Sequence, residues 1–419
     1  MWIFSIRGRS GSVSVFLMLV LAAMVGLAMG MIAAGNRTAS TGMADSLFGS
    51  AGRSVLAEYD RGLKEDFGIF AFRGSAPEIE EKISFYVNYT LDGYPKMNMT
   101  KIEADTGEYS LMNLELFRKE IIGHAKFAAA RGFIKDDILK SGGGEGKEVS
   151  SSTGSLSVSG EKRDYVLRNS AVIDGLPSKE LGKGGSLWKK IRDSMSGAGE
   201  VFKKGGEGYW INKYIMLEFK NAQNDPAGRD TFFNYEAEYL LEGNYSDESN
   251  RKEFRKEVKA LRNAVDFAFI FSDPKMTAEV TALAATIAPG PGAAAAEAAL
   301  AETWALAEAE NDWKILEHGG KVPLYKTKGT WAVDLKSAVK DGSVGYIDTH
   351  AKSGLTYSGY LQTFLFFENS TVKTARIMDL IQINLKGTRN REFLIKECNL
   401  GFMFDAGVNG RSFRYAHKY

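Results

Sequence analysis

The sequence of 419 residues is poor in the residues that mark common chemistries and covalent cross-links. It contains one cysteine, Cys398, which excludes any intramolecular disulfide. Its four histidines lie far apart in the chain and show no metal-ligand spacing. The formal net charge of +1 gives no reason to propose nucleic acid as a partner. An exported domain of this chain would therefore depend on core packing alone, which a chain of this length can provide.

A phosphate-binding loop is also missing. The stretch GGGEGKE at 142–148 superficially resembles one. However, Ser141 occupies the position that requires the first glycine, and Glu148 occupies the position that requires serine or threonine. The stretch also lacks a flanking strand, so we do not interpret it as a nucleotide site.

The motifs of nucleophilic catalysis are equally weak. Two Ser-x-x-Lys matches occur, from Ser186 to Lys189 and from Ser337 to Lys340, but neither has a convincing companion Lys-Thr-Gly. No Gly-x-Ser-x-Gly motif is present. Cys398 lies on the apolar side of a predicted strand, which is typical of a core residue. The sequence therefore predicts no catalytic residue, no cofactor, no metal ligand and no enzymatic activity.

What the sequence does contain is one long apolar run near its start. Between Val13 and Ala34, Ser14 is the one polar residue. The core of a signal peptide is usually about 7–15 residues long, whereas a spanning helix needs roughly 20. The length favours a retained transmembrane helix over residues 13–34. The alternative is a cleaved signal peptide with a processing site at residues 33–35.

The charges that flank this run predict its orientation. Arg7 and Arg9 precede the run, and Arg37 follows it. With the free amino terminus, the excess of positive charge lies on the N-terminal side, which should remain in the cytoplasm. We therefore expect a cytoplasmic leader at residues 1–12 and a single-pass protein of the cell membrane, with the bulk of the chain outside.

Small residues recur along the apolar run. Ala22, Gly26, Gly30 and Ala34 follow one another at every fourth position, so they share one face of a helix. Such a face lets two helix backbones approach closely in lipid. These four residues are the predicted helix–helix contact. The alternative is that a membrane helix rich in alanine and glycine produces this spacing by chance.

Beyond the apolar run, the helical pattern continues. Apolar residues recur every four positions, at Met43, Leu47, Ala51, Val55, Tyr59, Leu63 and Phe67. No proline interrupts residues 13–68, which predicts one shaft of roughly 80 Å. A break near Gly35-Asn36 is the alternative. Residues 35–140 are then a helical stalk and the N-terminal part of an exterior domain.

Three further elements are expected within residues 35–140. Ser75 is a candidate cap for a helix that Pro77 and the following glutamates favour, and Gly93 ends it. Residues 100–112 predict a short hairpin. Another helix is expected from about Leu114 to Leu139.

The composition then changes over residues 141–207, which form a variable linker in this interpretation. Residues 141–160 are mostly glycine and serine, which is typical of a flexible linker or a long loop. A basic stretch follows, in which the apolar side chains of Leu187, Trp188, Ile191 and Met195 share one helical face. This stretch predicts a small helix that packs on the domain or, alternatively, lies on a membrane surface.

Residues 208–408 form the main exterior part, and residues 409–419 a tail. Alternation in FNYEAEYLLEG predicts a half-buried strand at about 234–241. A helix with Asn250 as its cap follows and ends at Asp273-Pro274. Two alanine-rich helices then flank residues 288–292. Their acidic residues argue against a second membrane hairpin and predict a solvated face; these are Glu297, Glu302, Glu308, Glu310 and Asp312.

Two more helices are expected near residues 356–367 and 370–386, followed by a strand. In that strand, Leu394, Cys398, Leu400, Phe402 and Phe404 point one way. The predicted fold class is therefore α+β: a single N-terminal transmembrane helix continues toward a mostly helical exterior domain with a small antiparallel sheet.

Several blocks of sequence, in this order, resemble a known family. They are GSVSVFLMLVL at 11–21, SVLAEYDRGLKEDFGIFAF at 54–72, FNYEAEYLLEGNYSDESNRKEF at 233–254, LRNAVDFAFIFSD at 261–273 and GKVPLYKT at 320–327. The chain is similar to an uncharacterised family of single-pass surface proteins of Gram-positive bacteria. Members of that family occur alongside tight-adherence (Flp-type) pilus and secretion genes. The resemblance covers nearly the whole chain except 141–207.

The resemblance implies a role in assembly rather than a reaction. The expected function is that of a non-enzymatic, membrane-anchored structural or assembly component of a pilus-like envelope machine, with other membrane-anchored pilus or secretion subunits as partners. Gly11 resembles the end of a pseudopilin leader, although such leaders carry glutamate five residues later, where this chain has Phe16. The alternative is a membrane-tethered binding module for a ligand or surface polymer. An extracytoplasmic hydrolase is a third, with no residue constellation behind it.

Overall fold

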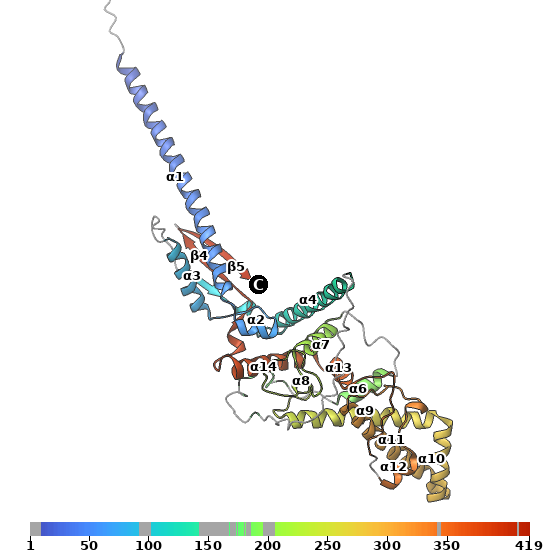
Figure 1. Cartoon of the computed structure of the whole chain (residues 1–419). Helices are drawn as coiled ribbons and strands as arrows, with labels where there is room; N and C mark the ends of the chain where they lie inside the picture. Colours follow the sequence, from blue (N-terminus) through green and yellow to red (C-terminus); the bar gives the residue numbers. More distant parts are fainter. Residues whose placement is uncertain are drawn as a thin grey trace, which may run out of the picture. The chain divides into compact units, whose positions relative to one another are not determined.

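The computed structural model describes residues 10–91, 102–141, 206–341, 345–408 and 410–419, with residues 167, 173, 175–179, 181 and 186–195 (Figure 1). These residues form two compact units. Unit 1 comprises Met1–Asp60, Phe70–Ser110 and Glu397–Tyr419, and unit 2 comprises Arg61–Ile69 and Leu111–Lys396. The described residues are mostly helical with small antiparallel sheets, which confirms the predicted α+β class.

Unit 1 is built on one long helix, α1, which runs without interruption from Ser10 to Ala57 (Figure 1). Its apolar first part is exposed and is long and apolar enough to cross a membrane. Its second part contributes Ala44, Phe48 and Val55 to the core of unit 1. The predicted helix over residues 13–34 is confirmed as a helix, and its two parts belong to one continuous rod of about 70 Å.

The predicted ends of this rod need two corrections. The helix does not break near Gly35, since a single glycine costs only about 1 kcal/mol in a helix and no proline follows it. The helix also does not reach residue 68. It ends at Ala57, and the Asp60 N–H donates to the Ala71 carbonyl at 2.8 Å, which turns the chain. The next helix, α2 (Arg61–Phe67), belongs to unit 2.

The sheets of unit 1 join segments that are distant in sequence. A three-stranded antiparallel sheet has the order β2-β4-β5, formed by Glu103–Asp105, Gly401–Val408 and Arg411–Lys418. In its register Phe404 lies opposite both Ala104 and Tyr415. A second pair joins β1 (Phe72–Arg73) to β3 (Cys398–Asn399). The predicted strand around Phe402 is confirmed.

Two predictions in this region were wrong. Residues 100–112 do not form a hairpin with each other, because β2 pairs with β4 and the next residues form a 3-10 turn, η1 (Gly107–Tyr109). Residues 409–419, expected as a tail, contain β5. The partner of β2 lies far away in the sequence, so local patterning could not identify that pair. β5 pairs with the preceding strand, β4, and it was missed because its own strand pattern was not recognised.

The core of unit 1 lies between α1, the sheet and α3 (Ala76–Leu91). Alternate residues of β4, including Phe402, Phe404 and Ala406, are buried in this core. At the start of α3, the Ser75 N–H and hydroxyl both donate to Glu78 Oε2, at 2.7 and 3.1 Å. The predicted helix after Ser75 is therefore confirmed, with its glutamate closing the first turn.

Unit 2 is helical. It contains α2, α4 (Leu114–Ser141), α6 (Leu187–Met195), α7 (Glu207–Glu218), α8 (Glu236–Glu242), α9 (Asp247–Ser272), α10 (Pro274–Ile287), α11 (Ala293–Glu317), α12 (Leu335–Asp341), α13 (Tyr357–Phe367) and α14 (Ser370–Thr388) (Figure 1). Short 3-10 turns are η2 (Gly290–Gly292), η3 (Lys328–Thr330) and η4 (Ile395–Glu397). The helices predicted over 114–139, 250–272, 356–367 and 370–386 and on either side of 288–292 are confirmed.

The strand predicted at 234–241 is wrong, because these residues form α8. Alternation suggested one buried face, but α8 is buried all round, including Glu236 and Glu238. Asn384 Nδ2 donates to Glu236 at 2.6 Å, and the Tyr357 hydroxyl donates to Glu238 at 2.6 Å. Polar partners from distant helices thus reach both carboxyl groups that the alternation had assigned to solvent, although Glu238 Oε2 has no hydrogen-bond partner within the described residues.

Two smaller points concern α9 and α6. The cap of α9 is Ser246, whose hydroxyl accepts from the Ser249 N–H at 3.3 Å, and not Asn250, which is buried within the first turn. In α6, Leu187 and Ile191 are buried, which confirms the predicted small packed helix and leaves this apolar face unavailable to a membrane surface. Of the Gly- and Ser-rich residues 141–160, all but the first lie outside the described residues.

Candidate functional site

The predicted contact face lies on the exposed first part of α1. Ala22, Gly26, Gly30 and Ala34 follow one another along this helix, and all four are exposed. A Cβ atom placed at Gly26 or Gly30 would meet no described atom within 4 Å. The four residues therefore share one open face of α1, and their small side chains would let a second helix backbone approach closely.

In each Ser-x-x-Lys match the serine hydroxyl donates to a carboxylate and not to the lysine of the match. The Ser337 hydroxyl donates to Asp334 Oδ2 at 2.6 Å at the start of α12. The Ser186 hydroxyl donates to Glu257 Oε1 at 3.2 Å just before α6. Both serines thus lie at helix starts, which explains the spacing without catalysis. Cys398 is buried in β3, and burial raises the pKa of its thiol, as expected for a core residue.

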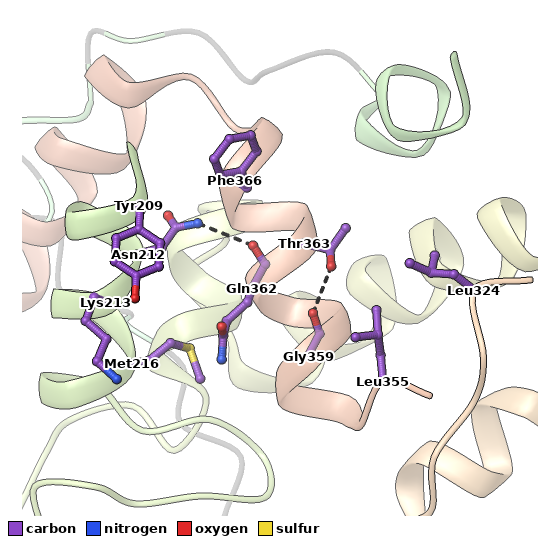
Figure 2. Close-up of a pocket in the computed structure, with 10 residues that line it drawn as sticks. All are labelled: Tyr209, Asn212, Lys213, Met216, Leu324, Leu355, Gly359, Gln362, Thr363 and Phe366. Carbon is purple, nitrogen blue, oxygen red and sulfur yellow. Dashed lines mark hydrogen bonds between the residues drawn. The ribbon is translucent and has the colours of Figure 1, made fainter. Parts of the chain in front are cut away.

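A pocket that the sequence did not predict lies in unit 2 between α7 and α13 (Figure 2). Its volume is about 440 Å³. Leu324 and Leu355 complete the lining. These two residues lie on segments that are joined by backbone hydrogen bonds between Val322 and Leu355, at 2.9 and 3.0 Å. One wall of the pocket is therefore a pair of short extended segments tied to each other.

The packing of α13 against its own N-terminal segment shapes one end of this pocket. The Thr356 hydroxyl caps α13 by accepting from the Gly359 N–H at 3.2 Å. A Cβ atom at Gly359 would lie 3.1 Å from Leu355 Cβ, so the glycine leaves room for the leucine against the helix. The Thr363 hydroxyl donates to the Gly359 carbonyl at 2.9 Å (Figure 2).

The orientation of Asn212 in the pocket is fixed by a buried lysine behind it. Lys373 Nζ donates to Asn212 Oδ1 at 3.1 Å and to the Leu365 carbonyl at 2.5 Å. An ammonium group is a donor only, so Asn212 must face it with its oxygen. The Asn212 amide nitrogen then faces the Gln362 carbonyl, 3.3 Å away (Figure 2). Burial lowers the pKa of Lys373 to about 8, while Glu368 opposes that shift.

The polar lining of the pocket is rich in donors. Lys213 is its one charged residue, and no carboxylate lines it among the described residues. The Lys213 ammonium, the Tyr209 hydroxyl and the Gln362 side-chain amide make no hydrogen bond or ion pair with any residue that the structure describes. The rest of the lining is largely apolar, including Met216 and Phe366.

A buried ionic cluster holds the wall that carries Leu324. Arg262 of α9 donates through Nη1 to the carbonyls of Pro323 and Leu324, at 3.0 and 2.8 Å. The same guanidinium pairs with Asp266 at 2.5 Å and with Asp312 of α11 at 2.9 Å. All three charged side chains are fully or almost fully buried. The segment that contains Leu324 is therefore attached to the interior by charge-assisted hydrogen bonds.

The same cluster continues through Lys326. Its ammonium pairs with Glu308, and with Asp312 at 2.7 Å. Glu308 also accepts from the backbone N–H groups of Ala332 and Val333. Three buried carboxyl groups thus face two cations. Burial raises the pKa of Asp266 to about 7, and its Oδ2 has no hydrogen-bond partner within the described chain, which favours the neutral acid there.

For Glu308 and Asp312, this cluster corrects the expectation that the acidic residues of α11 form a solvated face, whereas Glu302 is exposed as expected. Glu308 and Asp312 are buried on the side of α11 that faces α9. A signal was present: Arg262 with Asp266, and Glu308 with Asp312, each stand four residues apart on helices with apolar faces. The sequence alone could not pair one set with the other, because the two helices approach only in the fold.

A family model described as a family of unknown function, DUF5702, matches residues 144–410. This is more than half of the sequence. The chain belongs to the family DUF5702. The part shared with DUF5702 includes the pocket and the ionic cluster, whereas α1 precedes it. No curated protein and no solved structure matches the chain. The expectation of an uncharacterised family is confirmed at this level.

Proposed function

We propose that this DUF5702 protein is a non-enzymatic, membrane-anchored structural or assembly component of a pilus-like envelope machine of the tight-adherence type. The observation that carries the proposal is the continuity of α1. The helix leaves its apolar first part exposed and places its second part in the core of unit 1. The resemblance of the sequence blocks to surface proteins found beside such pilus and secretion genes supports the same role.

A continuous helix of this kind couples a membrane segment rigidly to a folded unit. Phe48 and Val55 are fixed in the core, so unit 1 and the apolar part of α1 move together. A force or displacement applied to the helix within the bilayer is transmitted to the sheet outside it. An assembly component needs this property, whereas a simple tether does not.

The partners in this proposal are other membrane-anchored pilus or secretion subunits. In lipid there is no hydrophobic drive to join helices, so association requires backbones that can touch. The face of Ala22, Gly26, Gly30 and Ala34 offers such a contact, and it is open in the structure. In this proposal the N-terminus lies in the cytoplasm, and unit 2 and the part of unit 1 that follows the apolar run lie outside, as the flanking arginines favour.

The test is cross-linking of α1 in native membranes. Gly26→Leu with Gly30→Leu keeps the helix apolar, so insertion and orientation survive while helix association is lost. Ala28→Leu is the matched control, because residue 28 lies on the opposite side of the helix and gains a similar bulk. Equal cross-linking of the double variant, the control and the native protein, with equal insertion, would remove this contact from the proposal.

Retention of the anchor is tested separately. The intact protein should sediment with membranes, keep its N-terminal residues and be cleaved by protease added from outside. Release into the medium with a mature N-terminus at Asn36 would instead establish the cleaved signal peptide and contradict the assembly role.

The pocket favours a second candidate function. An apolar pocket with a few convergent polar groups is the usual form of a small-molecule site. The pocket between α7 and α13 has this form. A membrane-tethered binding module for an extracytoplasmic ligand is therefore the alternative, and it is compatible with the same anchor.

A further inference from the structure

We infer that the pocket between α7 and α13 binds a small amphipathic carboxylate, with its apolar body against Met216 and Phe366 and its carboxylate at Lys213 (Figure 2). This inference deepens the second candidate function and rests on it. It does not depend on the contact face of α1.

The positive charge of the lining favours a ligand with a negative charge. Lys213 is the one charged residue of the lining, and it forms no ion pair with any residue in the described ranges. A lysine without a carboxylate partner next to an apolar pocket offers an ion pair to an incoming anion. A cationic ligand would place like charges together in the same partly enclosed space, which is unfavourable.

The hydrogen-bonding groups point to the same class of ligand. The Tyr209 hydroxyl and the Gln362 side-chain amide line the same pocket as Lys213 and make no hydrogen bond with any described residue, so their donors are unused. The Asn212 amide nitrogen does not add to these donors, because it donates to the Gln362 carbonyl at 3.3 Å (Figure 2). A carboxylate is acceptor-only when ionised and takes several such donors.

The remaining surface requires an apolar body on the ligand. Met216, Leu324, Leu355 and Phe366 leave apolar side chains on several sides of the space. The volume of about 440 Å³ falls within the roughly 300–1,000 Å³ of typical small-molecule pockets. A bare inorganic anion would leave these walls uncovered, whereas an arylalkyl or alkyl carboxylate fills them.

The pocket is largely formed before any ligand arrives. Arg262 fixes the Leu324 segment through two carbonyls, and the backbone bonds of Val322 fix Leu355. Walls held in this way cost little ordering on binding, which leaves more of the contact energy for affinity.

Three probes of the same shape separate charge from hydrophobicity: 4-phenylbutyrate, 4-phenylbutanol and 4-phenylbutylamine. The full chain in lipid nanodiscs, labelled at the methionine methyl groups, is titrated with each. The Met216 methyl signal, identified by its loss in Met216→Leu, reports on the pocket itself and not on partition into lipid. We expect saturable shifts of this signal, with the acid bound at least threefold more tightly than the alcohol and the amine weakest.

The decisive variant is Lys213→Met. Lys213 is exposed and forms no ion pair within the described chain, so the fold should be retained, which near-UV circular dichroism checks. The affinity for 4-phenylbutyrate should fall by about fivefold while that for 4-phenylbutanol stays unchanged. Lys340→Met is the control with the same charge change on α12, outside the pocket, and it should bind like the native protein.

The inference is overturned by any of three results. They are equal binding of the three probes, no shift of the Met216 signal up to the solubility limit of all three, and binding by Lys213→Met that matches binding by Lys340→Met. None of these results concerns cross-linking of α1, so failure of the ligand site is distinguishable from failure of the assembly role.

Discussion

The helix α1 lies close to β5 at Gly52, next to His417, and Gly52→Ala should loosen this contact. An added Cβ atom would lie 2.8 Å from Cε1 of His417 and closer still to two other ring atoms. The imidazole has little room to retreat, because it stacks on Phe404 with ring centroids 5.9 Å apart and on Tyr415 at 6.4 Å. Either the ring or the whole of β5 must move.

The change in stability expected for Gly52→Ala is the sum of two opposing effects. Alanine is favoured over glycine in a helix by about 1 kcal/mol. Overpacking a filled core costs typically 1–3 kcal/mol, and a separation below 3 Å from a ring held by stacking places this site at the upper end. The net effect expected for unit 1 is a destabilisation of about 2 kcal/mol.

Gly42→Ala is the matched control on the same helix. A Cβ atom there would meet no described atom within 4 Å, so only the helix preference remains. This variant should stabilise the helix by up to about 1 kcal/mol. The two substitutions are chemically identical and differ only in what surrounds the added methyl group.

Hydrogen exchange of the full chain in nanodiscs measures the effect. Peptides from β4 and β5 should exchange faster in Gly52→Ala than in the native protein, while peptides from α9 and α11 stay unchanged as an internal reference. If Gly52→Ala protects β5 as well as Gly42→Ala does, then the packing of α1 on His417 is not as tight as described, and the reasoning fails.

Further predictions concern ionisable groups. Burial raises the pKa values of Glu236 and Glu238 from 4.5 to about 7. Between pH 4.5 and pH 7 the folded state therefore binds more protons than the unfolded state. The free energy of unfolding of unit 2 should then fall as the pH rises from 4.5 to 7, by up to about 3 kcal/mol per group, and denaturant titrations followed by tryptophan fluorescence that show a rise would contradict this. Burial, with Arg53 beside it, lowers the pKa of His417. The stability that neutral His417 contributes to unit 1 should be lost as the pH falls below about 6.5, the pKa of histidine in the unfolded chain. This pH response is opposite to that of the two glutamates. It should appear as faster hydrogen exchange in β5 after correction for intrinsic exchange rates. Arg262→Met should destabilise unit 2 by about 3–5 kcal/mol, because it strands buried carboxylates, and a loss below 1 kcal/mol in the same denaturant assay would show that the ionic cluster is not essential.

The elements predicted correctly are those with local signals. Asp273 accepts hydrogen bonds from the N–H groups of Lys275 and Met276, and Pro274 starts α10, so a few adjacent residues determine where α9 ends and α10 begins. The apolar run of α1 and the glycines after α10 act in the same local way. Such elements could be located from the sequence because their causes lie within one turn of the chain.

The elements predicted wrongly depend on distant partners. Glu236 is buried because Asn384 donates to it, across 148 residues of sequence. The pocket exists because α7 meets α13, and the Asn212–Gln362 hydrogen bond joins residues 150 positions apart. Alternation in α8 resembles a strand only if its glutamates face water. No local pattern reveals that a donor from another helix will reach them.

Unit 1 combines the first and the last segments of the chain, so it can fold only late in biosynthesis. The second part of α1 is made early, yet β4 and β5, which cover Phe48 and Val55, come from residues after 400. At usual rates of synthesis the gap is on the order of tens of seconds. Throughout that interval the apolar side chains of Phe48 and Val55 lack the strands that cover them in the folded unit. Unit 1 can therefore close only when synthesis of the chain is almost complete, and any factor that shields this apolar surface has to act before then.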